Sequence, residues 1–404
     1  MLRLDRIMIS GFKGVDRFRM DVAPELTLLV GVNGAGKSSI LQALGFVRFL
    51  AEDYPQAFFD ERGWDRGDFK FRSLPRARTT LISIGMRFSG TPWGTLIWSI
   101  QWGLNHGRLY RERVLLRSDL SAEPETILTF DQKEGGRFGT EELPSLGFRG
   151  SLVEAAGLLG APPRDKEIVA ALLAWAKGIR SLELLSPAEM KRHTRRSPLD
   201  MGAKGERLAG FLAALSSEQK SRIVERLSRF YPIDGLDTVR KRAGWIDLKV
   251  SERYANFGQV HAGHMSDGFM RLLALCAIPE WGDAASLILL DEIEDGIEPH
   301  ILTRVIDLVR AESRAQVIAT SHSPLLANGV GVDAIRFISR DGEGRTIAAD
   351  AADMPAFRHG SEYMGPGELW ANTEMAVLQR QAAERASASA SQAADATGDA
   401  DSRL

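Results

Sequence analysis

The sequence has 404 residues, of which 44% are hydrophobic and 26% are charged, and its formal net charge is −2. This composition supports a large buried core, and the near-neutral charge excludes a uniformly basic coat for nucleic acid while it allows local basic patches. The single cysteine, Cys276, excludes an internal disulfide framework and a cysteine-based metal site, and its apolar surroundings predict a buried side chain.

Strong strand patterns dominate the first part of the chain. Alternating apolar residues over 2–10 and 18–22 predict a hairpin, and the continuous apolar run 26–31 predicts a strand buried on both faces. An apolar stripe over 38–50 predicts a helix. From residue 79 to 114 the period is again two, with glycine-containing turns, which is typical of an antiparallel meander.

The middle of the chain changes character twice. Residues 118–150 are poorly patterned and rich in Gly, Pro and Glu, so we predict a loop there. Residues 151–230 carry helical spacing and predict a helical insertion, after which 245–253 reads as a returning strand.

The pattern of buried strands resumes toward the C-terminus. Residues 285–292 predict a continuous buried strand, a helix is expected over 300–313, and the strands 315–323 and 334–339 follow. Residues 376–404 are biased toward Ala, Ser and Asp and lack large apolar side chains, which predicts a disordered tail.

A complete P-loop pattern spans Gly31 to Ser38, between a buried strand and a helix. Its glycines allow a tight turn in which backbone N–H groups point at a β-phosphate, Lys37 supplies a cation to the β- and γ-phosphates, and the Ser38 hydroxyl can ligate Mg²⁺. We therefore expect ATP and Mg²⁺ as cofactors. The residues predicted to contact nucleotide in this loop are Gly31, Asn33, Gly34, Ala35, Gly36, Lys37, Ser38 and Ser39.

Two carboxylates end the buried strand at 285–292. We expect Asp291 to hold Mg²⁺ and Glu292 to orient and deprotonate an attacking water. Two further segments are weaker signals by themselves. Ser266 and Gly268 precede an apolar helix as a helix cap with a close-approach glycine, and His322 ends a third strand.

The order and context of these four motifs resemble the ABC-type ATPase heads of the SMC, RecF and OLD-like group, in particular stand-alone bacterial AAA-like ATPases linked to phage defence. RIMISGFKG is similar to that group's first strand and turn, GVNGAGKSS to its Walker A motif and MSDGF to its signature motif. ILLDEIEDGIEPH is similar to its Walker B motif and D-loop, ATSHSP to its switch-histidine strand, and GELW to the end of many such chains. The resemblance covers roughly residues 1–50 and 260–340.

The resemblance implies an ATP-dependent homodimer in which Ser266 and Gly268 reach the γ-phosphate bound by the other copy and His322 contacts it from its own side. Asp267 stands where a second glycine is common, and Glu298 stands where the D-loop often has Asp, which puts that contact in doubt. Gln101 is a candidate for the Q-loop glutamine.

The patterns predict an α/β fold class, and the resemblance implies a P-loop ABC-ATPase head with an N-terminal antiparallel β subdomain, a mainly parallel core sheet and a helical insertion. We expect one composite unit over residues 1–375, with a disordered tail over 376–404. Its parts are an N-terminal lobe at 1–117, a loop and helical insertion at about 118–244, and a lobe with the signature and Walker B motifs at 245–375. The N-terminus lacks the apolar segment of a signal peptide, and no long apolar run is present, so we expect a cytoplasmic protein without a membrane span.

Three roles for the ATPase compete. It could regulate a separately encoded effector or nuclease in nucleic-acid-related defence, carry its own nuclease as OLD-type proteins do, or serve DNA repair in the manner of RecF. The absence of an Asp-x-Asp in a strand context disfavours the intrinsic nuclease, and the absence of sustained heptads disfavours long SMC arms.

Contact with DNA or RNA is a further expectation, carried by basic clusters that could equally be solvated surface. The three clusters are Arg72, Arg76 and Arg78; Arg108, Arg111 and Arg113; and Lys191, Arg192, His193, Arg195 and Arg196. Trp93, Trp98 and Trp102 occur at strand spacing, and for these we expect core packing in preference to a base-stacking platform.

Overall fold

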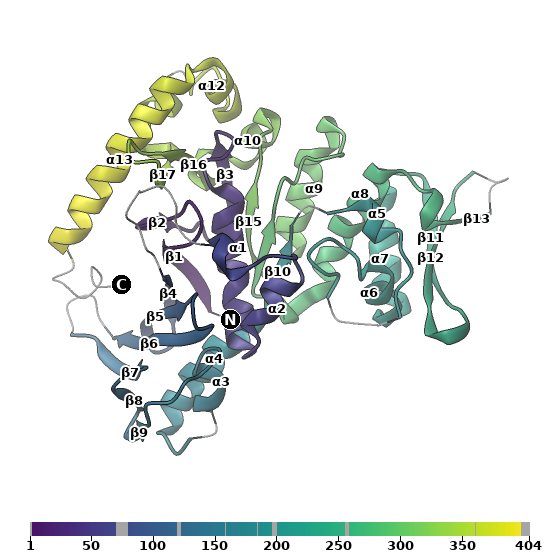
Figure 1. Ribbon diagram of the computed structural model, residues 1–404. Coiled ribbons are helices and arrows are strands. Elements are labelled where there is room, and N and C mark those ends of the chain that lie inside the picture. The colour runs from purple at the N-terminus through teal and green to yellow at the C-terminus, as the bar shows by residue number, and fades with distance from the viewer. Residues whose placement is uncertain are drawn as a thin grey trace.

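A six-stranded, mainly parallel sheet forms the centre of the fold in the computed structural model (Figure 1). The structure describes residues 2–69, 80–118, 123–157, 159–183, 185–195, 200–254, 258–359 and 361–396. Across the sheet the strands are β10 (Ile179–Leu182), β14 (Leu287–Leu290), β15 (Gln316–Thr320), β3 (Leu26–Gly31), β16 (Ile335–Arg340) and β17 (Thr346–Asp350), of which only β17 runs antiparallel to its neighbour.

Every residue of β3, β14 and β15 is buried, as their continuous apolar sequences predict. The helices α1 (Lys37–Ala51) and α9 (Pro299–Glu312) follow β3 and β14, in agreement with the predicted helices. Because parallel strands carry their carboxyl ends to one edge of the sheet, the segments after β3, β14 and β15 meet there.

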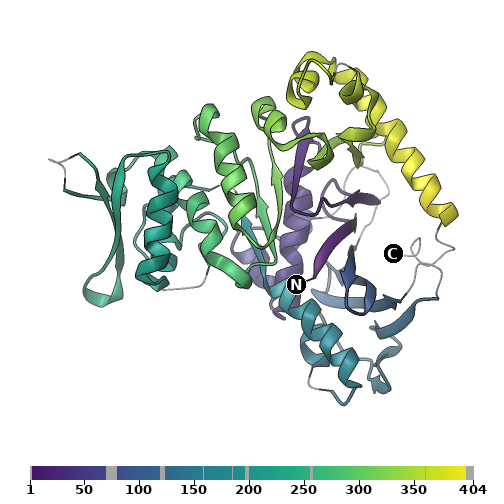
Figure 2. The same cartoon turned by 180° about the vertical axis from the view of Figure 1, so that it is seen from behind.

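An eight-stranded antiparallel sheet forms the N-terminal lobe and confirms the predicted hairpin and meander (Figure 2). Its strands in spatial order are β2 (Phe18–Asp21), β1 (Arg3–Ser10), β4 (Leu81–Thr91), β5 (Gly94–Gly103), β6 (Arg108–Arg117), β7 (Glu125–Asp131), β8 (Gly135–Phe138) and β9 (Glu141–Leu143). Trp98 and Trp102 are buried in its core and Trp93 is half-buried, which confirms core packing for these rings.

The prediction of a loop over residues 118–150 is wrong, because β7, β8 and β9 extend the antiparallel sheet to its edge. The glycine content of this segment is the reason for the wrong prediction. A Cβ added at Gly136 would collide with the carbonyl oxygen of Thr129 on the neighbouring strand, so glycine is required inside the ladder here.

The predicted helical insertion at 151–230 is helical only in part. It contains α3 (Val153–Ala156), α4 (Pro163–Lys177), α5 (Pro187–Met190), α6 (Leu208–Ala214) and α7 (Ser217–Ser228). Between α4 and α5, however, β10 joins the edge of the central sheet beside β14. Part of this region therefore belongs to the central sheet. The boundaries of the predicted parts stay a prediction.

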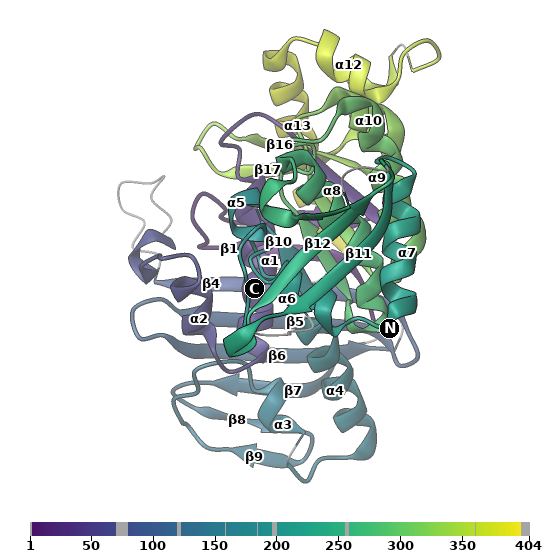
Figure 3. The same cartoon turned by 90° about the vertical axis from the view of Figure 1, so that its right-hand side faces the viewer.

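The strand predicted at 245–253 is present as β12 (Ile246–Glu252), but it pairs with β11 (Ile233–Arg240) and β13 (Gln259–His261) and forms a separate three-stranded sheet. This sheet lies at the end of the molecule opposite α13, as Figures 1 and 3 show. It packs on α6 and α7.

The C-terminal part holds α8 (Asp267–Ala277), α10 (Pro324–Val330), α12 (Pro366–Asn372) and α13 (Met375–Ala396). The prediction of a disordered tail from residue 376 is wrong as far as residue 396. Alanine is the strongest helix former, and Leu378 and Ala382 bury one stripe of α13 against β16 and β17. Residues 397–404 of the predicted tail lie outside the described residues.

Two smaller expectations are also tested by the fold. Cys276 is buried in α8, and burial raises the pKa of its thiol to about 12. None of the helices in the described part of the chain combines the length and the apolar character that a membrane crossing requires.

Candidate active site

The P-loop lies between β3 and α1, and it is closely approached by two further strands, β16 and β17. Gly31 has φ +134° and Gly36 has φ +107°, values in the region that favours glycine. A Cβ on Gly31 would collide with the carbonyl oxygen of Ile338, and one on Gly36 with the hydroxyl of Thr346. Thr346 also donates a 2.7 Å hydrogen bond to the Ala35 carbonyl oxygen. The loop is thus held in its turn by β16 and β17.

The Lys37 ammonium is held inside this loop. Its Nζ donates hydrogen bonds of 3.0 Å to the carbonyl oxygens of Gly31 and Val32. Burial lowers the pKa of Lys37 to about 8, and the carboxylates of Asp291, Glu294 and Glu292 oppose that shift. A lysine that is ionised at neutral pH but incompletely solvated is well suited to receive a phosphate anion.

A hydroxyl–carboxylate network joins the three strand ends. Ser38 Oγ donates to Asp291 Oδ1 at 3.1 Å, and Thr320 Oγ1 donates to the same oxygen at 2.6 Å. Burial is the largest influence on the Asp291 carboxyl and raises its pKa, while the two hydroxyl donors act in the opposite direction. The predicted magnesium ligands Ser38 and Asp291 are therefore within hydrogen-bond distance of each other.

Thr320 is a site residue that the motif analysis missed, although a polar residue at the end of an otherwise apolar strand is a usable signal. Its Oγ1 also accepts a 2.8 Å hydrogen bond from the backbone N–H of Glu292. Glu292 itself has φ +49°, a left-handed conformation that is costly for a residue with a Cβ. The Thr320 hydroxyl therefore holds both Asp291 and Glu292 in position.

These residues line an open cleft of about 570 Å³, a volume in the range of nucleotide and cofactor sites. Its lining consists of Gly14, Asn33, Gly34, Gly36, Lys37, Ser38, Ser39, Glu292, Glu294, Asp295, Thr320, His322 and Arg340. Gly31, Ala35 and Asp291 are buried and are not among these lining residues. Among the described residues, Gln101 is not part of the lining. It lies on β5 opposite Ser83 and Arg111.

His322 stands at the exposed rim of the cleft, next to a carboxylate that sequence analysis missed. Its backbone N–H donates to the Glu294 carboxylate. Burial and the nearby Lys37 ammonium lower the pKa of the His322 imidazole, which favours the neutral ring at pH 7. Arg340 was also missed, and it donates hydrogen bonds of 2.8 and 2.6 Å to the Gly34 carbonyl oxygen.

Comparisons with known proteins agree with this geometry. Residues 2–88 match a family model described as an AAA ATPase domain, and residues 150–328 match one described as an AAA domain, putative AbiEii toxin, Type IV TA system. In fold, the chain is similar to the structure of an Smc head bound to the C-winged helix domain of ScpA. That match has 14% sequence identity and a TM-score of 0.56, and it covers 86% of this chain and 97% of the other.

Two segments of the chain thus match AAA-type ATPase domain models, and its fold is that of an Smc head domain. A second similar structure is an Smc head domain with an extended coiled coil bound to the C-terminal domain of ScpA, derived from Pyrococcus furiosus. It has 14% identity and a TM-score of 0.55 and covers 86% of this chain and 96% of the other. None of the curated proteins matches the sequence.

The predicted signature segment lies at the start of α8. Ser266 is its N-cap and accepts a 3.2 Å hydrogen bond from the N–H of Phe269, as a capping residue should. Asp267, at the position that often holds glycine, is exposed and pairs with Lys191 at 2.7 Å. Neither Ser266 nor Gly268 is among the described residues that line the P-loop cleft.

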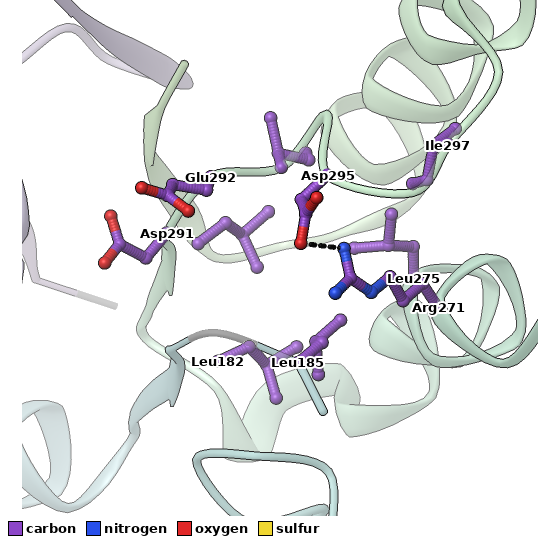
Figure 4. Close-up of a pocket in the computed structure, with 10 residues that line it drawn as sticks. Leu182, Leu185, Arg271, Leu275, Asp291, Glu292, Asp295 and Ile297 are labelled. Atoms are coloured by element: carbon purple, nitrogen blue, oxygen red, sulfur yellow. Dashed lines mark ion pairs between the residues drawn. The ribbon is translucent and has the colours of Figure 1, made fainter. Parts of the chain in front are cut away.

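The signature helix is nevertheless attached to the loop that follows Glu292. A Cβ added at Gly268 would lie 2.6 Å from the carbonyl oxygen of Gly296. Figure 4 shows the small crevice beneath this loop, where Arg271 of α8 forms an ion pair with Asp295. Glu298, at the D-loop position, is the N-cap residue of α9 and points an exposed carboxylate toward His300 at 3.4 Å.

The basic clusters predicted from the sequence are largely engaged within the chain. Arg72, Arg76, Arg78 and Arg196 lie outside the described residues. On β6, Arg111 pairs with Asp131 at 2.8 Å. In the third cluster Arg192 pairs with Glu189 at 2.8 Å, and Arg195 lies over the ring of Trp245.

Proposed function

We propose that this chain binds ATP with Mg²⁺ in the P-loop cleft and hydrolyses it. The loop N–H groups and Lys37 would hold the β- and γ-phosphates, and the neutral His322 ring would contact the γ-phosphate from the rim. Glu292, whose exposed carboxylate lines the same cleft, would orient and deprotonate the attacking water. The observation that carries the proposal is the hydrogen-bond network of Ser38, Asp291, Thr320 and Glu292 beside this cleft.

The site fits Mg²⁺ in its donor chemistry. Ser38 Oγ and Asp291 Oδ1 are hard oxygen donors that already face each other, and magnesium prefers oxygen ligands. A bound Mg²⁺ would neutralise charge on the β- and γ-phosphates. Asp291 and Ser38 are the residues that would hold it.

We further propose that two copies close around two nucleotides. In the described part of the chain Ser266 and Gly268 do not line their own P-loop cleft, while Asp267 at the start of α8 leaves 71% of its side chain exposed. The N-terminus of α8 is therefore available to a nucleotide bound by another copy, where its positive end would favour the γ-phosphate.

The proposed output of this cycle is control of a separately encoded effector in nucleic-acid-related defence. One supporting observation is the name of the matched family model, which refers to a putative toxin of a type IV toxin–antitoxin system. A RecF-like role in DNA maintenance is the alternative. The identity of the gene product that co-purifies with the ATP-bound protein distinguishes the two roles.

The decisive experiment is light scattering of Glu292→Gln with and without ATP. We expect the variant to double its mass with ATP, because nucleotide is bound and hydrolysis is blocked. Lys37→Ala, which lacks the phosphate-binding cation, should stay at its nucleotide-free mass. The double variant Ser266→Arg with Glu292→Gln should bind ATP without dimerising. If Glu292→Gln turns over ATP at the wild-type rate, the assignment of the base is wrong.

A further inference from the structure

The tip of the β11–β12 hairpin is an exposed basic segment that the motif analysis did not single out. Every residue from Val239 to Trp245 is exposed, and three consecutive cations, Arg240, Lys241 and Arg242, occupy its centre. The hairpin lies at the end of the molecule farthest from α13 (Figure 1), and Figure 3 shows its two long strands facing the viewer.

The turn at this tip has a defined conformation. Ala243 has φ +61° and Gly244 has φ +77°, the pair of left-handed residues found in tight hairpin turns. The N–H of Lys241 donates a 2.7 Å hydrogen bond to the carbonyl oxygen of Trp245 and closes the turn. The cations are therefore presented on an ordered strand end, which reduces the entropy lost when a partner binds.

The buried carboxylate of Asp247 connects the β11–β12 hairpin to the chain segment that contains the third basic cluster. Asp247 is 1% exposed, forms an ion pair with Lys241 and contacts the ring nitrogen of His193. Around it lies a cleft of about 320 Å³, whose lining includes Lys191, Arg192, His193, Lys241, His261 and His264. Within that lining Asp247 is the single acidic residue, but Lys191, Arg192 and Lys241 are each paired with a carboxylate, so the unpaired positive charge lies at the hairpin tip.

The two outer arginines of the tip are not neutralised by the protein. Arg240 and Arg242 form no ion pair with any residue that the structure describes, in contrast to Arg111 and Arg192 elsewhere in the predicted basic clusters. An unpaired exposed cation is free to neutralise a backbone phosphate, and the release of the cations condensed on the nucleic acid drives such binding.

An aromatic ring lies within this surface. Trp245 is 36% exposed, and the Arg195 guanidinium lies 4.3 Å from the centre of its ring. The His193 ring approaches the same indole edge-on at 6.5 Å between centroids. A surface indole flanked by cations is the combination that binds unpaired bases, since the ring stacks on a base while the cations contact the adjacent phosphates.

We infer that the hairpin tip and residues 192–195, here called the hairpin surface, bind single-stranded nucleic acid. Arg240 and Arg242 contact phosphates, and Trp245 with Arg195 stacks on an unpaired base. The bases inside a duplex are paired and stacked, so the surface favours single strands over duplex. The inference goes beyond the proposed ATPase cycle and needs no bound nucleotide, so it can fail or succeed independently of that cycle.

The hairpin surface is also close to the signature segment in the chain and in space. Lys191, which lines the basic cleft, forms the 2.7 Å ion pair with Asp267 at the start of α8. A strand that competes for Lys191 would release Asp267 at the N-terminus of α8.

The test uses the full chain without ATP and a fluorescein-labelled 20-mer of deoxythymidine, with binding followed by anisotropy. We expect Arg240→Gln with Arg242→Gln to weaken binding roughly tenfold and to reduce the slope of log K against log salt by about 1.4. The matched control is Arg380→Gln with Arg385→Gln, which removes the same charge from exposed positions of α13. That control should bind like the wild type.

A second pair of variants tests the stacking. Trp245→Ala should weaken binding of the 20-mer at least about fivefold, whereas Trp245→Phe, which keeps a ring, should retain most of it. An unlabelled duplex of equal length should compete poorly. The inference is overturned if the wild type does not bind the 20-mer, if the hairpin and α13 double variants bind alike, or if duplex competes as well as single strand.

Discussion

The hydroxyl of Thr320 donates a 2.6 Å hydrogen bond to the carboxylate of Asp291 and so joins the ends of two neighbouring parallel strands. Both residues are buried, and the same hydroxyl accepts the N–H of Glu292. One side chain thus sets the position of the proposed metal ligand and of the proposed base. Its role is to position the two acidic residues.

Thr320→Val should show whether Thr320 acts by positioning the two acidic residues and not by binding ATP. Valine has nearly the same shape but leaves the Asp291 oxygen and the Glu292 N–H without this partner, so both acidic residues lose their fixed geometry. We expect kcat for ATP hydrolysis to fall by about 10- to 100-fold while the Kd for ATP changes by less than about threefold. Thr320→Ser, which keeps the hydroxyl, should restore most of kcat. Equal activity of the valine and wild-type proteins would contradict the assignment.

The left-handed backbone conformation of Glu292 predicts that glycine at this position favours stability more than alanine does, although either substitution removes the function. Glycine adopts φ +49° without the steric cost that a Cβ brings, so Glu292→Gly should be more stable than Glu292→Ala by about 0.5–1 kcal/mol in urea unfolding. Both variants lack the carboxylate and should be inactive. A glycine variant that is less stable than the alanine variant would show that this conformation carries little strain in the folded protein.

The lowered pKa of Lys37 predicts a pH dependence of ATP affinity. Burial brings this pKa to about 8, so the ammonium is present below that pH and is lost as the pH rises through it. If only the protonated form binds phosphate, the Kd for ATP should rise about tenfold between pH 7 and pH 9. Equilibrium binding of a fluorescent ATP analogue measures this change. In Lys37→Arg the guanidinium stays charged, and the same pH ratio should be close to one.

The positions of the P-loop, of Asp291 with Glu292 and of His322 were predictable because each lies at the end of a strand whose apolar run is continuous. Buried parallel strands bring their carboxyl ends to one edge, and Lys37, Asp291 and His322 do meet there. Contacts that depend on strand register were not predictable. Arg340 reaches the P-loop because β16 pairs with β3, which no local pattern reveals.

Amino-acid composition led to a wrong structural prediction in two segments, and the reasons were opposite. Glycine-rich β7–β9 looked like a loop, although Gly136 is required by the close approach of Thr129 in the next strand. The alanine-rich segment after residue 375 looked disordered because it has few large apolar side chains. A single stripe that contains Leu378 and Ala382 is sufficient to dock α13 on the sheet.

Gly268 allows the cross-subunit role of the signature segment to be separated from a role within the chain. Its Cα faces the Gly296 carbonyl oxygen, and a Cβ there would lie 2.6 Å from that atom, which is backbone and cannot swing away. Gly268→Ala should therefore destabilise the nucleotide-free protein by about 1–3 kcal/mol, measured by urea unfolding without ATP. A glycine needed only for the other copy's γ-phosphate would leave that value unchanged. Gly263→Ala is the matched control, because no atom lies within 4 Å of a Cβ at that nearby position. If the two alanine variants unfold at the same urea concentration, the contact between α8 and the loop after Glu292 does not constrain this position.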